Sequence, residues 1–349
     1  MIDLAIIIVS WNVRPLLHRC LTSIFATATQ GIDLRVIVVD NASTDGSAGM
    51  VRDTFPQVQV VANDENAGFT CGNNQALRAL GFQSQRLEIR DLSRSRDWRS
   101  GTCPEIDRRM GDSGSDDILA SSLPRYVLLL NPDTEVVGNA LATMIAFMDS
   151  QPDVGVVGPQ LLYPDGTIQS SRRRFPTLAT AFLESTVVQQ WWPDNPVARR
   201  YYVLDQPDDA IQDVDWVVGA CLMARREAVE QAGLLDEGFF MYSEELDWCR
   251  RIKDRGWRVV YLPAAQVIHH EGKSSEQVVP ARHIHFQRSK VRYFRKHHGR
   301  PAASLLRTFL LATYAYQLAV EGGKWILGHK RPLRRERVAA YWRVLRSGL

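Results

Sequence analysis

Acidic side chains recur in this sequence where an apolar run stops. The run Tyr126–Leu130 is followed within three residues by Asp133, which comes after a proline, and the run Leu34–Val39 ends on Asp40. Proline fixes its own φ angle, so the carboxylate after it is held in a stiff turn. Oxygen ligands suit Mg²⁺ and Mn²⁺, metals that commonly bridge protein carboxylates and a diphosphate. A metal site at Asp133 is therefore one interpretation, and an ordinary turn or helix N-cap residue is the other.

Three more acidic residues are grouped in the segment YSEELDWC, at Glu244, Glu245 and Asp247. Clustered carboxylates raise one another's pKa, which can leave one of them suited to act as a general base. The simpler interpretation is a solvated first turn of a helix, which the helix dipole favours. His269 and His270 follow a later apolar run, where an imidazole can complete a metal shell, contact a phosphate or serve the structure.

The elements that must position these residues alternate between strand and helix. Continuous apolar runs predict buried parallel strands, and apolar positions near a period of 3.6 predict helices between them. Strands are expected over Leu4–Ser10, Leu34–Val39, Val58–Val61, Tyr126–Leu130 and Val154–Val157, and helices over Pro15–Ala26, up to Phe55, after the loop ENAGF, and over Gly138–Ser150. This order predicts an α/β fold with a doubly wound, mainly parallel sheet.

Such sheets bind ligands in a crevice at the carboxyl ends of their strands. Asp40 and Asp133 are therefore expected to face one cleft. A helix is expected over Glu244–Asp254, with Glu245 and Asp247 free to point away from its apolar face. The residues of that apolar face are Leu246, Cys249 and Ile252.

Charge is distributed unevenly along the chain, although the net charge is only +3. Residues 276–349 contain 16 Lys and Arg but 3 Glu, which gives +13, while the other 275 residues carry 26 basic and 36 acidic side chains, which gives −10. The basic tail predicts an anionic partner surface, and without a nucleic-acid-binding motif a membrane is favoured over nucleic acid. The uncharged run Thr308–Val320 is shorter than the about 20 residues of a membrane span. An interfacial amphipathic helix is expected there, or a helix that packs on the body or a partner subunit.

These patterns predict two domains, the first over residues 1–275 and the second a basic, helical, membrane-associated tail over 276–349. The stretch 82–124 is polar and without periodicity, so it is expected to be a surface insertion in the first domain. The opening MIDLAIIIVSWN lacks the basic leader and cleavage site of a signal peptide. A cytoplasmic protein at the inner face of the cell membrane is therefore expected.

An ordered series of motifs resembles glycosyltransferase family 2, in particular its rhamnosyltransferase-like branch. The match covers roughly residues 3–81 and 125–298, and its motifs are IIVSWN, VIVVDNASTDGS, NAGFTCGNNQAL, YVLLLNPDTEV, VGACLMARREAVEQAGLLDEGFFMYSEELDWCRR and GWRVVYLPAAQVIHHEGKSS. The resemblance implies a GT-A fold. It also implies transfer of a sugar from a nucleotide diphosphate with inversion at the anomeric carbon.

The resemblance also implies roles for individual residues. Asp133 would bind the divalent metal, Mg²⁺ or Mn²⁺, together with His269, and Glu245 would be the general base. Glu245 stands where the family usually has Asp, so Glu244 and Asp247 stay open as alternatives. The residues expected to contact the nucleotide sugar are Ser10, Asn12, Asp40, Asn66, Gly68, Asn131 and Asp133.

The implied reaction uses a nucleotide-diphosphate sugar, with rhamnose suggested by the branch, and a glycan or lipid-linked glycan acceptor in cell-surface polysaccharide synthesis. A sugar nucleotidyltransferase is disfavoured, because it would need a Gly-rich basic loop where the sequence has SWNVRPLLHRC. The alternative from a different class is a catalytically inactive, membrane-associated scaffold with a nucleotide-sugar-binding fold.

Overall fold

The fold was analysed in a computed structural model that describes residues 2–26, 31–83, 123–184, 191–193, 195–271, 279–328 and 330–349. Most of the expected insertion at 82–124 lies outside the described residues. The chain divides into two compact units. Unit 1 contains Met1–Arg173, Gln206–Phe240 and Glu244–Glu271, and unit 2 contains Arg174–Asp205, Met241–Ser243 and Gly272–Leu349. The predicted domain boundary at residue 275 concerns which part of the chain folds independently, and it stays a prediction.

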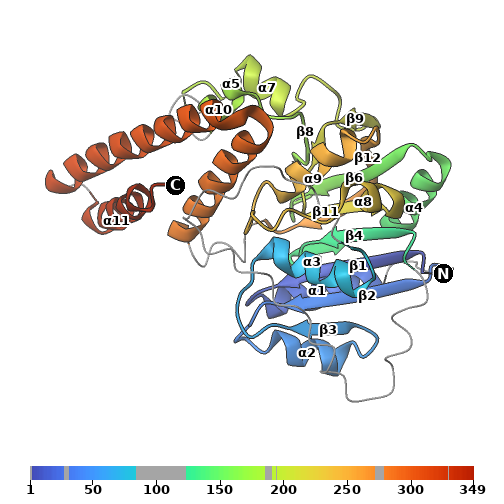
Figure 1. The fold of residues 1–349 in the computed structure, drawn as a ribbon. Coiled ribbons are helices and arrows are strands. Elements are labelled where there is room, and N and C mark those ends of the chain that lie inside the picture. The colour runs from blue at the N-terminus through green and yellow to red at the C-terminus, as the bar shows by residue number, and fades with distance from the viewer. Residues whose placement is uncertain are drawn as a thin grey trace. The chain divides into compact units, whose positions relative to one another are not determined.

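Unit 1 is built on one large mixed sheet (Figure 1). Its main strand order is β3-β2-β1-β4-β11-β6-β12-β5, with β7 beside β6 and β9 beside β12. The strands are β1 (Leu4–Ser10), β2 (Leu34–Asp40), β3 (Gln59–Ala62), β4 (Tyr126–Leu130), β5 (Thr134–Val136), β6 (Val154–Leu162), β7 (Ile168–Gln169), β9 (Gln212–Val214), β11 (Cys221–Arg225) and β12 (Arg258–His269). The first four are mutually parallel, as are β6 and β12, while β11 runs antiparallel between β4 and β6. The prediction of a mainly parallel α/β sheet is confirmed.

Helices cover both faces of this sheet. Successive strand residues point to opposite sides, so a strand that is apolar throughout needs a packing partner on each face. Ile6 and Ile8 belong to the core that includes α1, α2 and α4. Val9 points the other way, where a Cβ on Gly72 of α3 would lie 2.9 Å from its side chain. The helices of unit 1 are α1 (Arg14–Ala26), α2 (Ser47–Thr54), α3 (Phe69–Ala79), α4 (Ala140–Ser150), α8 (Arg226–Ala232) and α9 (Glu244–Lys253).

The strand predicted over Val154–Val157 is longer in the structure and continues through Pro159 to Leu162. Gly158 and Pro159 are typical strand breakers, so the sequence pattern stops before them. The neighbouring strand β12 shifts register between Leu262 and Gln266, beside this proline. The irregular pairing lets β6 continue past the proline. It also lets β12 extend as far as His269, its last residue.

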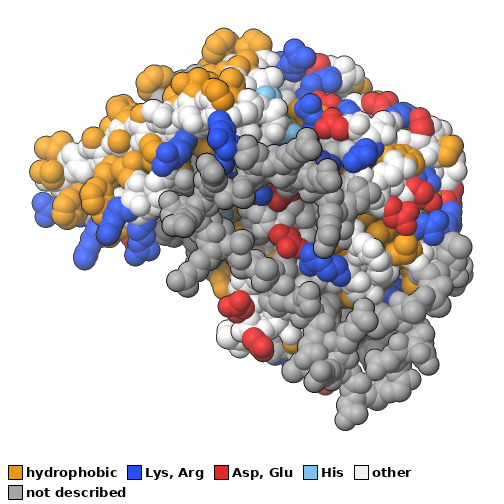
Figure 2. Space-filling view, viewed as in Figure 1, with side chains coloured by type: hydrophobic (Ala, Val, Ile, Leu, Met, Phe, Trp, Pro, Cys, Tyr) orange, Lys and Arg blue, Asp and Glu red, His pale blue; other side chains and the backbone are white. Residues whose placement is uncertain are grey.

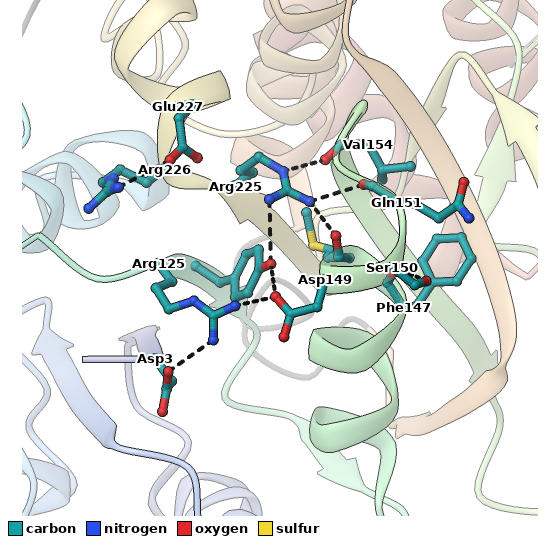
Figure 3. Close-up of polar contacts among 12 residues, drawn as sticks. Asp3, Arg125, Phe147, Asp149, Ser150, Gln151, Val154, Arg225, Arg226 and Glu227 are labelled. Carbon is teal, nitrogen blue, oxygen red and sulfur yellow. Dashed lines mark hydrogen bonds and ion pairs between the residues drawn. The ribbon is translucent and has the colours of Figure 1, made fainter. Parts of the chain in front are cut away.

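An arginine network ties the amino ends of the central strands to the helix layer (Figure 3). Arg125 donates to Asp3 at 3.1 Å and also to Asp149 at the end of α4. Arg225, at the end of β11, donates to the carbonyl of Val154 at 2.9 Å. These contacts lie at the start of β4, so they fix that strand at the end opposite to Asp133.

A small two-stranded sheet, β8 (Arg172–Arg173) with β10 (Trp216–Val217), also belongs to unit 1. In unit 2 the structure describes the helices α5 (Leu178–Leu183), α7 (Pro196–Tyr201), α10 (Val279–Ile326) and α11 (Arg331–Ser347). Gly299, with φ 85°, interrupts α10, and Pro301 begins its second part. None of the helices in the described residues is long and apolar enough to cross a membrane.

Candidate active site

The carboxyl ends of β1 and β2 present two buried polar side chains. Ser10 and Asp40 are opposite each other in the parallel register and are 0% and 3% exposed. Asp40 accepts the Ser43 N–H on Oδ2 at 3.0 Å. Its Oδ1 and the Ser10 hydroxyl are buried and have no hydrogen-bond partner among the described residues. Buried polar atoms are almost always satisfied, so this edge has hydrogen-bonding capacity that suits a polar ligand.

Two asparagines predicted to touch the nucleotide sugar also hold loops in this structure. Asn12, with φ 53°, accepts the Thr44 N–H on its side-chain oxygen at 2.8 Å and so joins the loops after β1 and β2. Asn66 accepts the Gly68 N–H at 3.0 Å, which closes a turn just before α3. Their contacts in this structure shape the loops at this edge of the sheet, and a direct ligand contact for either stays a prediction.

Gly68 lies where only glycine fits. Its φ is 87°, and an added Cβ would be 2.7 Å from the carbonyl oxygen of Phe240, the atom that accepts the Phe69 N–H. Gly68→Ala is therefore expected to lower the free energy of unfolding by about 2 to 4 kcal/mol and to weaken donor binding. Urea unfolding measures the first effect. Gly49→Ala in α2 is the control, because nothing lies within 4 Å of its Cβ position, and an unchanged Gly68→Ala protein would contradict the prediction.

Asp133 and His269 come together at the ends of β4 and β12. His269 Nε2 lies 3.4 Å from Asp133 Oδ1, and both side chains are buried. His269 Nδ1 is 2.8 Å from the side-chain oxygen of Gln169, whose amide nitrogen donates to Glu271 at 3.0 Å. Because the amide nitrogen faces the carboxylate, the oxygen faces the imidazole and accepts from Nδ1–H. Nε2 is then left with a lone pair directed toward a carboxylate.

This pair fits a divalent metal. Two lone-pair atoms that face each other without a proton between them form an arrangement that a cation stabilises. Nε2 has no hydrogen-bond partner among the residues that the structure describes. In the described part of the chain, no three His, Cys, Asp or Glu side chains are grouped for a metal. A site of two protein ligands is consistent with Mg²⁺ or Mn²⁺, since Mg²⁺ usually keeps several waters and takes substrate oxygens.

The second histidine of the pair has a different environment. His270 Nε2 is 2.6 Å from Glu135, and Arg19 lies 3.5 Å from the same carboxylate oxygen. The His270 backbone N–H donates to the Asp133 carbonyl at 2.9 Å. His270 therefore helps to hold the turn that carries Asp133. Asn131 also fixes this turn, since its N–H donates to Ala220 and its carbonyl accepts the Thr134 hydroxyl at 2.8 Å.

Glu244 and Glu245 begin α9 and share one environment. Glu244 is buried, and burial followed by repulsion from Glu245 raises the pKa of Glu244 well above its usual value. Burial also raises the pKa of Glu245, against backbone amides that include Gly219 and Leu246. One oxygen of each carboxyl is buried without a hydrogen-bond partner among the described residues. The pair is thus suited to hold and release protons.

Gly219 lies directly against the candidate base. A Cβ on Gly219 would be 3.4 Å from the Cβ and Cγ of Glu245. The Val218 N–H donates to the Ser171 carbonyl at 2.9 Å, next to the small sheet of β8 and β10. The small sheet therefore positions Gly219 next to the side chain of Glu245.

The expectation that Asp247 points freely away from the core is wrong. Asp247 is 0% exposed, and it accepts Arg251 Nε at 2.8 Å. Arg251 in turn donates to the carbonyls of Ala232 and Leu234. Asp247 thus closes a buried network that anchors α9 to the end of α8, and the helix period alone does not reveal that partner.

Asp247→Ala is expected to be a folding defect and not a catalytic one. Removing one member of a buried, hydrogen-bonded ion pair costs about 3 to 5 kcal/mol. Chemical denaturation should show this loss, while the folded fraction keeps its turnover rate. A variant with wild-type stability and no turnover would make Asp247 the base.

Four relevant residues lack any sequence signal of their own. Gln169 and Glu271 orient His269, Gly219 touches Glu245, and Glu135 binds His270. Gln169 and His269 are separated by 100 residues, so only the paired strands show that they meet.

Comparison with known proteins decides the family. The model of the protein family described as "Glycosyltransferase like family 2" matches residues 3–283, which is more than half of the chain. The chain belongs to glycosyltransferase-like family 2. This enzyme is 27% identical over 281 residues to an N-acetylglucosaminyl-diphospho-decaprenol L-rhamnosyltransferase of Mycobacterium tuberculosis, a match that covers 80% of each chain. It is 29% identical over 148 residues to the rhamnosyltransferase WbbL of Escherichia coli K12, across 42% of this chain and 52% of that one.

The fold agrees with this family. The mannosyltransferase PcManGT from Pyrobaculum calidifontis, solved in complex with GDP-Man and Mn²⁺, superposes with a TM-score of 0.52 at 17% identity. The superposition covers 98% of this chain and 87% of that one. The predicted GT-A fold and glycosyltransferase class are therefore confirmed, and the alternative of an inactive scaffold is not needed.

Proposed function

We propose that this glycosyltransferase moves a sugar, with rhamnose as the first candidate, from a nucleotide diphosphate to a lipid-linked glycan with inversion. The observation that carries the proposal is the Glu244–Glu245 pair, whose raised pKa values and unpartnered oxygens suit a general base. The printed name of the mycobacterial relative, which covers 80% of both chains, supports rhamnose as donor sugar and a lipid diphosphate acceptor. Cell-surface polysaccharide synthesis follows as the setting.

Glu245 acts as the base in this reaction. Its carboxylate takes the proton of an acceptor hydroxyl, and that oxygen forms a bond to the anomeric carbon. The bond from this carbon to the diphosphate oxygen breaks on the opposite side, and the nucleotide diphosphate leaves with the electron pair. Burial and the charge of Glu245 raise the pKa of Glu244 well above its usual value, so Glu244 holds its proton more strongly than an ordinary Glu side chain.

Other residues bind and orient the donor. Ser10 and Asp40 offer an unpartnered hydroxyl and carboxylate oxygen to the nucleoside. Asp133 and His269 would hold Mg²⁺ or Mn²⁺, which supplies Lewis-acid stabilisation to the leaving diphosphate. Gln169 keeps the His269 lone pair available for that ion by accepting from its other nitrogen.

A panel of nucleotide sugars tests the proposal. The purified protein is incubated with each sugar and Mg²⁺ or Mn²⁺, with and without EDTA, and binding and slow release of nucleotide diphosphate are measured. Selection of one donor that EDTA abolishes is the expected result and names the sugar. Turnover that EDTA does not change would remove the metal from the proposal, and absence of binding to every donor would remove the donor class.

A peripheral place at the inner face of the cell membrane belongs to this proposal. A lipid-linked acceptor lies at a bilayer, and residues 276–349 carry a charge of +13 that an anionic surface attracts.

A further inference from the structure

The second part of α10 has an outer face without charge. Leu305, Tyr316 and Ile326 are 56%, 58% and 73% exposed. The exposed positions recur at helical spacing, so they form one stripe along the helix. The members of this outer stripe are Leu305, Thr308, Ala312, Ala315, Tyr316, Ala319, Gly323 and Ile326. Exposed helix faces normally carry charged residues, so a stripe of this length is a surface that lacks its partner.

The inner face of the same helix is already packed within unit 2. Tyr314 contacts Tyr341 of α11, with ring centroids 5.8 Å apart. Glu321 is buried and pairs with Arg334 of α11. On the other flank, Phe309 meets Phe182 of α5 at 4.7 Å. The outer stripe therefore points away from the helices that hold α10 in place.

More exposed aromatic and large aliphatic residues lie near the end of α10 and on α11. Trp325 is exposed, and Leu327 is 85% exposed just after α10. Leu333 and Trp342 of α11 are exposed as well. Large apolar side chains next to Trp are typical of surfaces that lie at a membrane interface.

Basic side chains accompany this apolar surface. Figure 2 shows hydrophobic side chains along this helical arm with Lys and Arg side chains beside them. The exposed basic residues in the described part of 324–349 are Lys324, Lys330, Arg331, Arg335, Arg337, Arg343 and Arg346. Glu336 is the one exposed acid in the same described stretch. The end of α10 that carries Ile326 and Leu327 therefore has positive charge beside it, from Lys324, Lys330 and Arg331.

We propose that the outer stripe of α10 lies on an anionic lipid bilayer, with Ile326 and Leu327 in the headgroup–acyl boundary and the neighbouring Lys324, Lys330 and Arg331 on the phosphates. This rests on the proposed function, because it gives that enzyme a surface toward its lipid-linked acceptor. A second copy of the chain is disfavoured as occupant, since it would bring two segments of charge +13 together. An anionic bilayer complements both the apolar and the basic residues, and interfacial binding needs no spanning helix.

Vesicle binding by the full chain tests the inference. Affinity is measured by co-sedimentation with phosphatidylcholine vesicles and with vesicles that also contain phosphatidylglycerol. Wild type is expected to bind the anionic vesicles. The double variant Ile326→Asp with Leu327→Asp, and separately Lys330→Glu with Arg331→Glu, should each lose about tenfold or more in affinity. The matched controls are Ile211→Asp and Arg52→Glu, exposed residues of unit 1 that should bind as wild type does.

Two results would overturn the inference. One is wild-type vesicle affinity in the Ile326→Asp and Leu327→Asp variant. The other is a wild-type protein that sediments as a dimer, together with a variant that sediments as a monomer and binds vesicles as before. That result would assign the stripe to contact with a second copy of the chain.

Donor hydrolysis measured without vesicles separates this inference from the proposed function. All four variants should keep the wild-type hydrolysis rate, because none alters the site in unit 1. Vesicle binding by a protein that hydrolyses no nucleotide sugar would count against the proposed function and leave the membrane surface in place.

Discussion

Glu245→Gln is expected to lower turnover by about 10²- to 10⁴-fold while donor affinity stays unchanged. The amide matches the carboxylate in size, so the contact with Gly219 and the start of α9 are kept. It cannot accept the acceptor proton, and that proton transfer is the step assigned to this residue. Single-turnover kinetics and calorimetric titration with the donor measure the two quantities separately.

Glu244→Gln is the matched control for that experiment. The pKa of Glu244 is raised well above its usual value by burial and by the charge of Glu245, so the site favours the neutral form of this side chain. Gln imitates this neutral form, and turnover within about tenfold of wild type is expected. If Glu244→Gln abolished turnover and Glu245→Gln did not, the base would be Glu244.

The same assignment fixes the sign of the pH dependence. The base works only when deprotonated, so kcat/KM should fall as the pH decreases through the pKa of Glu245. Burial raises that pKa, which places the inflection above the 4.5 of an ordinary Glu side chain. A pH profile of the wild type should show this acid limb, and the residual activity of Glu245→Gln should lack it.

The sequence predicts best where one local pattern decides the structure. β1 begins at Leu4 and ends at Ser10 as expected, because a continuous apolar run of that length is stable only when both faces are buried. The helix expected over Glu244–Asp254 forms over Glu244–Lys253, with Leu246, Cys249 and Ile252 buried as its period requires. Asp40 is the last residue of β2, and Asp133 follows the carboxyl end of β4. These two parallel strands lie on either side of β1 in the sheet.

What the sequence does not predict depends on distant partners. The helix period places Asp247 off the apolar face, yet it is buried and accepts a hydrogen bond from Arg251, which also donates to two carbonyls before α9. The tautomer of His269 is set by Gln169 and Glu271 on other segments. Such contacts follow from the register of β12 against β6 and β7, which no local pattern contains.

Asp133→Asn is expected to weaken metal-dependent donor binding by about 100-fold or more, which is close to the upper end for a disturbed metal site. The amide keeps the size of the side chain but loses the charge that balances a divalent cation. It also presents an N–H₂ group that can donate to the His269 lone pair 3.4 Å away and occupy the ligand position. Titration with the nucleotide sugar at several Mn²⁺ concentrations measures the loss.

The control for this experiment is Asp53→Asn, an exposed carboxylate on α2 that should leave donor affinity unchanged. Gln169→Leu provides an independent arm, because it removes the acceptor that fixes the Nδ1–H tautomer without touching Asp133. A partial loss of about tenfold that extra Mn²⁺ restores would show that His269 binds the ion. The opposite outcome is that both wild type and Asp133→Asn bind the donor equally well with metal and with EDTA. The Asp133–His269 pair would then be a structural contact, and binding of the diphosphate would depend on other groups.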